Sequence, residues 1–180
     1  MTRDVNVPVR IRPARAADVP RIATIHVAAW HVAYRGLIPD DQIAARTLEL
    51  RIGHWTAGLE RSDLLIFVAC DDNEGVQGFA SVTRIEDEAF QSYLETLYVM
   101  PDAWGRGIGR ELLSAIGARL LDAGVTNMAL RTLRLGEARG FYERLGARLV
   151  PEGIRHGAER FDELVYAFDD LAVLTAEPQR

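Results

Sequence analysis

The chain reads LETLYVMPDAWGRGIGRELL from Leu94 to Leu113, and this stretch decides the fold. Its first part is rich in apolar and β-branched residues and predicts a strand, which Pro101 stops because proline cannot donate to a sheet ladder. Behind the glycines that follow, apolar residues recur at helical spacing, so we predict a helix that begins between residues 107 and 109. The stretch therefore predicts a strand, a glycine-rich turn and an amphipathic helix.

The glycine-rich turn has the composition of an anion-binding site. Gly105, Gly107 and Gly109 allow positive φ and leave no Cβ in the way of a ligand. Free amides at the start of a helix, together with the positive end of its dipole, suit a phosphate or pyrophosphate. Arg106 and Arg110 flank the glycines and would add positive charge. A flexible connection is the alternative interpretation, and three glycines beside two arginines favour anion binding over it.

Two common phosphate-binding motifs do not fit this turn. A dinucleotide-binding fingerprint requires Gly-x-Gly-x-x-Gly, and counted from Gly105 its last position is Arg110. A P-loop requires a lysine, and the chain contains none. The ligand of the turn must therefore belong to another class.

Composition predicts one globular domain over residues 1–180, because 48% of the residues are hydrophobic. The net charge of −5 argues against nucleic acid as a partner. The single cysteine, Cys70, permits no internal disulfide and is compatible with a reducing cytoplasm. No apolar run has the length of a membrane span or signal peptide, and the histidines show no metal-binding spacing. We therefore expect a cytoplasmic protein with no metal, no membrane partner and no nucleic-acid partner.

Periodicity along the chain gives the order β-α-α-β-β-β-α-β-α-β-β. Strands are predicted over residues 7–11, 64–70, 76–84, 94–99, 126–132, 147–150 and 161–168. Helices are predicted from residue 18 to 33 with Asp18 as cap, from 40 to 58, from 107–109 to 124 and over 137–145, and residues 173–180 are expected to be a frayed tail. Hairpins beside βα units predict an α/β fold of the α+β type, with a mixed, mostly antiparallel central sheet and helices on both faces.

The turn resembles motif A of the GNAT superfamily, the acyl-CoA-dependent N-acyltransferases, whose signature is Gln/Arg-x-x-Gly-x-Gly/Ala. In that register Trp104 stands where the family has Gln or Arg, and the glycines match at Gly107 and Gly109. The resemblance implies acetyl-CoA as cosubstrate, with the central strand and the next strand splayed apart to admit its pantetheine arm. It also implies that the CoA-binding residues are Leu97, Tyr98, Val99, Trp104, Gly105, Arg106, Gly107, Ile108, Gly109 and Arg110.

A second motif, from Ala138 to Gly146, is similar to motif B of the family, Asn-x-x-Ala-x-x-x-Tyr-Glu-x-x-Gly-Phe. The resemblance puts Tyr142 where the family has the tyrosine that protonates or hydrogen-bonds the CoA thiolate. A phenol is protonated at neutral pH and can donate. Leu135 takes the place of the asparagine and Ala147 that of the final phenylalanine. A tyrosine packed on a helix is the alternative interpretation.

Glu95 is the candidate general base. By strand alternation it shares a face with Tyr93, Leu97 and Val99, from which a carboxylate could deprotonate an ammonium directly or through a water. In the family register the frequent glutamate falls at Tyr93 instead, and Glu95 would then accept a structural hydrogen bond or recognise the substrate. For the acceptor amine, the resemblance points to three residues of the helix-to-helix segment, Trp30, Tyr34 and Arg35.

The leading hypothesis is an enzyme that transfers an acetyl group from acetyl-CoA to a primary amine by direct attack. The acceptor would be a small-molecule amine or a protein N-terminus, and the protein would form a homodimer. A binding module that senses acyl-CoA without turnover is the competing hypothesis. A third hypothesis has another acyl donor, such as propionyl-CoA or a succinyl-CoA whose carboxylate pairs with Arg35.

Overall fold

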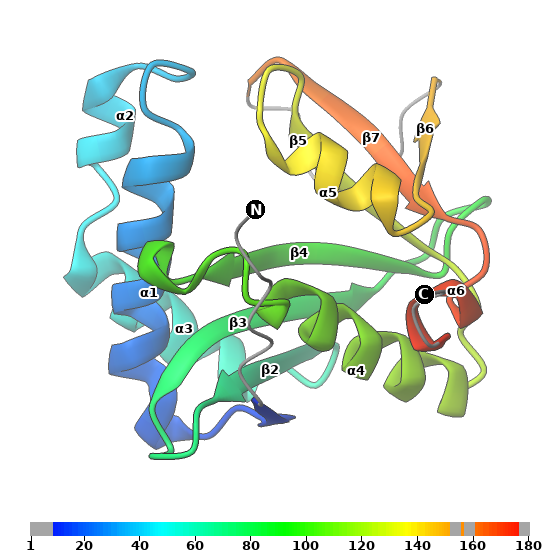
Figure 1. The fold of residues 1–180 in the computed structure, drawn as a ribbon, viewed down its shortest axis with the longest axis horizontal. Helices are drawn as coiled ribbons and strands as arrows, with labels where there is room; N and C mark the ends of the chain where they lie inside the picture. The colour runs from blue at the N-terminus through cyan, green and yellow to red at the C-terminus, as the bar shows by residue number, and fades with distance from the viewer. Residues whose placement is uncertain (1–8, 152–155, 157–160, 177–180) are drawn as a thin grey trace.

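The computed structural model describes residues 9–151, 156 and 161–176, and Figure 1 shows its arrangement. The strands are β1 (Arg10–Pro13), β2 (Leu64–Cys70), β3 (Val76–Arg84), β4 (Ser92–Val99), β5 (Met128–Leu133), β6 (Arg148–Val150) and β7 (Glu163–Phe168). The helices are α1 (Val19–Ala33), α2 (Asp40–Ala44), α3 (Leu48–Glu60), α4 (Ile108–Asp122), α5 (Ala138–Arg144) and α6 (Ala172–Thr175).

The seven strands form one mixed sheet in the order β1-β2-β3-β4-β5-β7-β6. Every neighbouring pair is antiparallel except β4 and β5, which run parallel because α4 connects them as a crossover. The predicted mixed, mostly antiparallel sheet is therefore confirmed. The predicted hairpin strands over residues 64–70 and 76–84 match β2 and β3 at both ends.

Helices cover both faces of the sheet, as the element order predicts. The continuous apolar run of β2 places hydrophobic side chains on both faces of the sheet. Phe67 and Ala69 pack with α4 on one face, whereas Ile66 and Val68 pack with α1 and α3 on the other. On the second face Trp55 of α3 is among the largest fully buried side chains. The two hydrophobic cores thus hold the sheet between two helical layers, the first of which contains α4.

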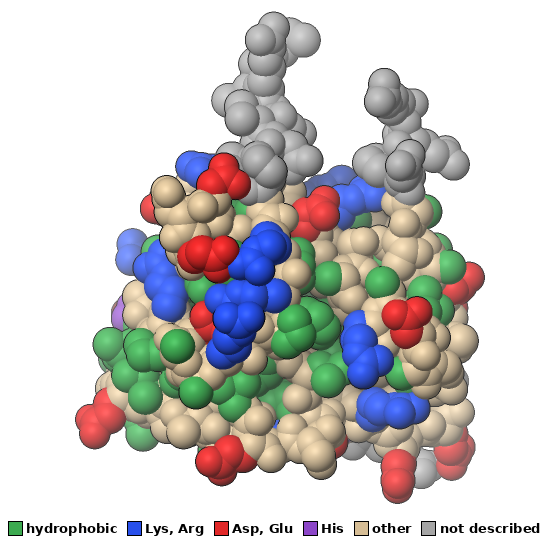
Figure 2. All heavy atoms as spheres, turned by 90° about the horizontal axis from the view of Figure 1, so that it is seen from below, with side chains coloured by type: hydrophobic (Ala, Val, Ile, Leu, Met, Phe, Trp, Pro, Cys, Tyr) green, Lys and Arg blue, Asp and Glu red, His purple; other side chains and the backbone are tan. Residues whose placement is uncertain are grey.

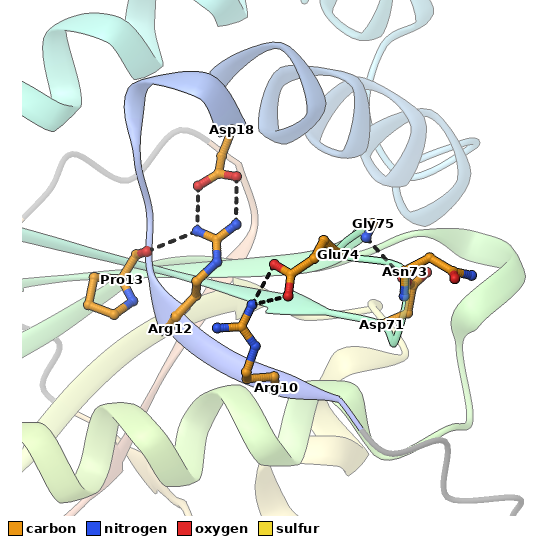
Figure 3. Close-up of polar contacts among 8 residues, drawn as sticks. All are labelled: Arg10, Arg12, Pro13, Asp18, Asp71, Asn73, Glu74 and Gly75. Carbon is orange, nitrogen blue, oxygen red and sulfur yellow. Dashed lines mark hydrogen bonds and ion pairs between the residues drawn. The ribbon is translucent and has the colours of Figure 1, made fainter.

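An ion pair between Arg12 and Asp18 ties β1 to the start of α1 (Figure 3). Nη1 and Nη2 of Arg12 donate to the Asp18 carboxylate, at 2.7 and 2.9 Å, and the Arg15 amide donates to it as well. The hydrogen bonds from Arg12 lower the pKa of Asp18. Asp18 is the N-cap residue of α1, as predicted, but its carboxylate makes no cap hydrogen bond to the helix because it is already bonded to Arg12 and Arg15.

Most predicted boundaries differ from the structure by one or two residues, and three differences change an element. The helix predicted over residues 40–58 is two helices, because Thr47 adopts an extended conformation and its hydroxyl accepts from the Leu50 amide to start α3. The tail predicted from residue 173 begins instead with α6, whose Leu174 is buried in the core that contains α4. The first strand begins at Arg10, and residues 7 and 8 of its predicted range lie outside the described residues.

Figure 2 shows the surface of the molecule as seen from below the view of Figure 1. Basic and acidic side chains lie side by side there, with apolar side chains between them. Among the helices that the structure describes, none has the length and apolarity needed to cross a membrane.

Candidate active site

The site is the wedge that opens between β4 and β5. These strands pair only at Tyr93 with Ala129 and at Leu94 with Leu130. Beyond Leu94 they have no further ladder partners in common, and Figure 1 shows β5 and β7 diverging from β4. The splayed strands that the family resemblance implies are therefore confirmed. The backbone of β4 from Leu97 to Val99 borders the wedge with its β5-facing edge free of sheet pairing.

A β-bulge at Glu95 corrects the predicted faces of β4. On β3, Ser81 pairs with Thr96 while the next residue, Val82, pairs with Leu94, so Glu95 has no partner in the register. The extra residue reverses the side-chain alternation. Leu97 therefore joins the core that contains Leu94 and α4, and the prediction that it shares a face with Tyr93 and Glu95 is wrong.

The glycine-rich turn delivers the N-terminus of α4 to the mouth of the wedge. Gly107 is the N-cap residue with φ +79°, and Gly105 has φ +75° with no atom within 4 Å of where a Cβ would lie. Both positions need the left-handed conformation that glycine adopts freely. The first amides of α4 have no intrahelical acceptor and carry the positive end of the helix dipole. Ile108 is buried beneath them and anchors the turn.

Gly109 has a packing role. A Cβ at this position would come within 3.1 Å of Phe141 Cζ, so the missing side chain lets α4 approach α5 closely. The glycine-rich turn thus has open space at Gly105 and tight packing at Gly109.

The larger side chains of the turn bond to the protein's own backbone. Trp104 is 44% exposed, and its indole Nε1 donates to the Val99 carbonyl at 2.8 Å. Arg106 donates to the Asp102 carbonyl, and Arg110 donates to the Ala176 carbonyl beyond α6. The tryptophan therefore ties the turn to the end of β4, whereas both arginines leave part of their guanidinium for other partners.

Tyr142 lies on α5, and its core also contains Leu94 and Leu97 of β4. Its side chain is buried in the core that contains α4, and its ring contacts Phe141 with centroids 5.2 Å apart. Burial, and then the nearby hydroxyl groups of Tyr34 and Tyr93, raise its pKa. It is therefore a neutral donor at physiological pH.

Further tyrosines surround the hydroxyl of Tyr142. Tyr34 and Tyr98 bring their hydroxyl oxygens within 3.4 Å of each other, and burial raises the pKa of both. Burial, and then the charge of Glu95, also raise the pKa of Tyr93. Sequence reasoning named Tyr34 and Tyr98 but missed Tyr93 as a site residue, because the bulge beside it leaves no signal in the letters.

The helix-to-helix segment forms the acceptor side of the site. Trp30 is 9% exposed and packs with Ile38, Ile43 and Leu133, so that α1 and α2 meet the end of β5. Its ring lies 4.1 Å from that of Tyr34. Trp30 is therefore largely a core residue and Tyr34 is half-buried, whereas Arg35 is exposed.

A buried histidine stabilises the α1 side of this region. His26 accepts a hydrogen bond from Trp55 Nε1 at 3.2 Å, and its ring lies 4.9 Å from that of Tyr98. Burial, and then nearby arginines, lower the pKa of His26 to about 3, so it stays neutral. His26 is thus a core residue.

Glu95 has a partner that sequence reasoning missed. Its Oε1 lies 2.8 Å from His156 Nε2, and each side chain is 30% exposed. The His156 ring also lies 4.6 Å from the ring of Tyr93. Because 61 residues separate the pair in sequence, no local motif could have found it.

The described residues fit the CoA ligand that the sequence predicts. Two left-handed glycines, a free helix N-terminus and an open strand edge converge at the mouth of the wedge. This arrangement suits a pyrophosphate followed by an amide-bearing arm. Within the described ranges no group of three or more His, Cys, Asp or Glu residues is arranged to hold a metal ion.

Comparison with known proteins agrees with this geometry. Residues 62–146 match the family model of the acetyltransferase (GNAT) domain. The N-acetyltransferase YuaI of Bacillus subtilis strain 168 is 28% identical over 92% of this chain and 96% of its own. An aminoglycoside N(6')-acetyltransferase type 1 of Stenotrophomonas maltophilia is 30% identical over 64% of this chain and 75% of its own.

A solved structure shares the fold. The PaiA N-acetyltransferase of Thermoplasma acidophilum, in complex with coenzyme A, superposes with a TM-score of 0.72 over 89% of this chain and 98% of that chain, at 17% identity. The sequence relatives, the family model and the wedge agree, so the chain belongs to the GNAT acetyltransferase family of acyl-CoA-dependent N-acyltransferases.

Proposed function

We propose that this protein transfers an acetyl group from acetyl-CoA to a primary amine, which attacks the thioester directly. The observation that carries this proposal is the buried, neutral Tyr142 on α5, which shares a core with Leu94 and Leu97 of β4. A phenol held there can donate a proton or a hydrogen bond to a thiolate as the C–S bond breaks. Acetyl-CoA itself supplies an activated acyl group that needs no metal.

The acyl donor would be held by backbone more than by side chains. The turn amides from Gly105 to Arg110 would bind the pyrophosphate, with Arg106 and Arg110 adding charge and Trp104 bracing the turn against β4. The free edge of Leu97, Tyr98 and Val99 would pair with the pantetheine amides like an added strand, and the Val99 amide would point at the thioester oxygen. Ile108 would anchor the start of α4, and Gly109 would let α4 pack closely against α5, so that the helix N-terminus stays at the pyrophosphate position.

Direct attack is favoured over an acyl-cysteine route. Cys70 is fully buried near the end of β2, and burial raises the pKa of its thiol. A buried thiol of raised pKa is a poor nucleophile. Glu95, together with His156, would instead receive the proton that the attacking amine releases.

The acceptor would be a primary amine of a small molecule or a protein N-terminus. One relative carries the name of an aminoglycoside acetyltransferase, which supports an amine acceptor. Trp30, Tyr34 and Arg35 would bound its binding site, since they lie on the α1 side of the wedge region. The location we propose for the reaction is the cytoplasm, where a free cysteine stays reduced.

A thiol-release assay with acetyl-CoA against a panel of primary amines tests this proposal. We expect turnover with at least one amine, and mass spectrometry should find the acetyl group on the amine and none on Cys70. CoA binding without turnover across the panel would favour an acyl-CoA sensor, a function that Trp104 and Leu135 support because they replace the polar residues of the family motifs. Faster turnover with succinyl-CoA or propionyl-CoA would show that the acyl donor is one of these and not acetyl-CoA.

A further inference from the structure

The Glu95 and His156 pair lies at the edge of the wedge, on the side of β4 that faces α3. Glu95 is the bulged residue of β4 and has no partner on β3. Its Oε1 lies 2.8 Å from Nε2 of His156. The ring of Tyr93 lies 4.6 Å from that of His156. Tyr93 pairs with Ala129 of β5 at the closed end of the wedge, so the His156 ring lies beside the strand pair from which the wedge opens.

The hydrogen bond fixes which nitrogen of His156 is available. An ionised carboxylate can only accept, so His156 Nε2 is the donor and carries a proton. In the neutral imidazole the remaining nitrogen, Nδ1, then has a free lone pair. A carboxylate bonded to one ring nitrogen also stabilises the imidazolium that forms when the other nitrogen takes up a proton.

A polar cavity gives this histidine access to water. Its volume is about 240 Å³, and His156 is one of the residues that line it. The charged residues that face His156 there come from the α3–β2 junction, from the end of β3 and from the β3–β4 turn: Arg61, Asp63, Arg84, Glu86 and Asp87. Hydrogen bonding to Arg61, and more weakly the charge of His156, lower the pKa of Asp63. A proton taken up by His156 can therefore leave to solvent through this cavity.

We propose that His156 is the general base of the acetyl transfer and that Glu95 is its positioning residue. This inference rests on the proposed function and refines it. As the amine nitrogen bonds to the acyl carbon, its N–H bond breaks and the proton passes to Nδ1 of His156, directly or through one water. The C–S electron pair leaves with the thiolate, which takes the proton of Tyr142. Tyr142 then regains a proton from water, which balances the proton that His156 releases. His156 returns its proton to water in the cavity.

The chemistry of the two residue types favours this assignment over Glu95 acting alone. Histidine ordinarily titrates close to neutral pH and glutamate well below it. General-base catalysis is most effective when the base titrates near the working pH. A carboxylate that orients a histidine therefore makes a better proton acceptor than the same carboxylate by itself.

Two single variants and their double distinguish the roles. His156→Gln keeps an N–H donor for Glu95 but offers no basic nitrogen, so kcat/KM at pH 7 should fall by about a hundredfold. Glu95→Gln leaves the imidazole without its stabilising charge and should lower kcat/KM by about tenfold. The kcat/KM of the double variant should be no lower than that of His156→Gln, because the pair acts as a unit. His54→Gln is the matched control, since His54 interacts electrostatically with Glu95 but does not bond to it.

The pH profile separates proton transfer from a structural role. The ratio of wild-type to His156→Gln kcat/KM should increase as the pH rises and the wild-type imidazole loses its proton, because the neutral fraction of the amine changes equally for both enzymes. A structural defect would lower the rate equally at every pH. Unchanged kcat/KM in His156→Gln with a hundredfold loss in Glu95→Gln would overturn the proposal and make Glu95 the base. A wild-type protein that binds CoA but acetylates no amine would instead overturn the proposed function, and the base assignment with it.

Discussion

At the scale of single residues, Tyr142 carries the last step of the proposed reaction. Tyr142→Phe keeps the buried ring, so CoA affinity and melting temperature should change little. General acid catalysis contributes about 10²–10⁴-fold, so kcat should fall by roughly a hundredfold when chemistry limits the rate. Steady-state kinetics with an amine substrate, with chemistry shown to be rate-limiting, would check this.

Tyr166→Phe is the matched control for Tyr142→Phe. Tyr166 is also buried, on β7, but its hydroxyl donates to Glu143 of α5. Its loss should lower the free energy of unfolding by about 1 kcal/mol and leave kcat unchanged. If Tyr142→Phe turned over at the wild-type rate, water or another donor would have to protonate the thiolate.

At the scale of elements, the N-terminus of α4 should carry CoA affinity. In Gly107→Asp the new carboxylate would occupy the pyrophosphate position and repel it, so CoA binding should be lost. The fold should survive, because aspartate tolerates left-handed backbone better than most residues. Isothermal titration calorimetry measures the affinity, and circular dichroism verifies the fold.

Gly124→Asp is the control for the α4 variant. Gly124 has φ +74°, open space around its Cβ position and a place just beyond the other end of the same helix. The identical substitution there should leave CoA affinity unaltered. Unchanged affinity in a folded Gly107→Asp variant would move the phosphate site away from α4.

The ion pair that joins β1 to α1 should make stability depend on pH. Arg12 lowers the pKa of Asp18 in the folded state. Asp18 therefore stabilises the fold above the carboxyl pKa of the unfolded chain, about 3.9, and this contribution is lost as the pH falls through the lower folded-state pKa. Acid is thus expected to weaken the attachment of β1.

Asp18→Asn tests this pair directly. The two side chains are only 12% and 10% exposed, so breaking the pair should cost about 3 kcal/mol at pH 7. Urea unfolding at pH 7 and again below the folded-state pKa should show the difference from wild type disappearing in acid. Asp63→Asn removes an exposed partner of Arg61 and should change little. An equal deficit at both pH values would contradict the assigned pKa effect.

At the scale of the whole molecule, acetyl-CoA and CoA should raise the melting temperature. A ligand that binds only the folded state at a hundredfold excess over its Kd stabilises it by about 2.7 kcal/mol. NAD and ATP at the same concentrations should do much less, since the turn lacks their fingerprints. A thermal-shift titration decides this, and a larger shift with NAD than with CoA would speak against the proposed cosubstrate.

The protein should also form a homodimer. Two-fold dimers are the commonest soluble oligomers. In the described part of the sheet, β6 is a terminal strand whose outer edge has no strand partner, and Leu149 on it is 47% exposed. Light scattering across a concentration series should show a mass of about 40 kDa, twice the 20.0 kDa of the chain. A single monomeric mass at high concentration would refute the dimer.

Local patterns in the sequence determined the elements and the glycine-rich turn. The apolar run of β2, the hairpin to β3 and the helix after Gly107 depend on neighbouring residues alone, so periodicity and turn chemistry were sufficient to predict them. Boundaries failed where a distant contact decided the conformation. Leu174 lies in a helix because it packs against the core containing α4. Asp18 is the N-cap residue of α1, but its carboxylate bonds to Arg12 and the Arg15 amide and not to the amides of the helix.

The acceptor side of the site was decided by tertiary structure. The β-bulge at Glu95 appears only in the pairing of β4 with β3, and it reverses the faces that simple alternation predicts. His156 reaches Glu95 across 61 residues, and the tyrosines around Tyr142 come from α1 and β4. Spacing in a sequence encodes contacts along one helix or strand. The partners of Glu95 and Tyr142 depend instead on how separate elements pack together, which only the folded chain defines.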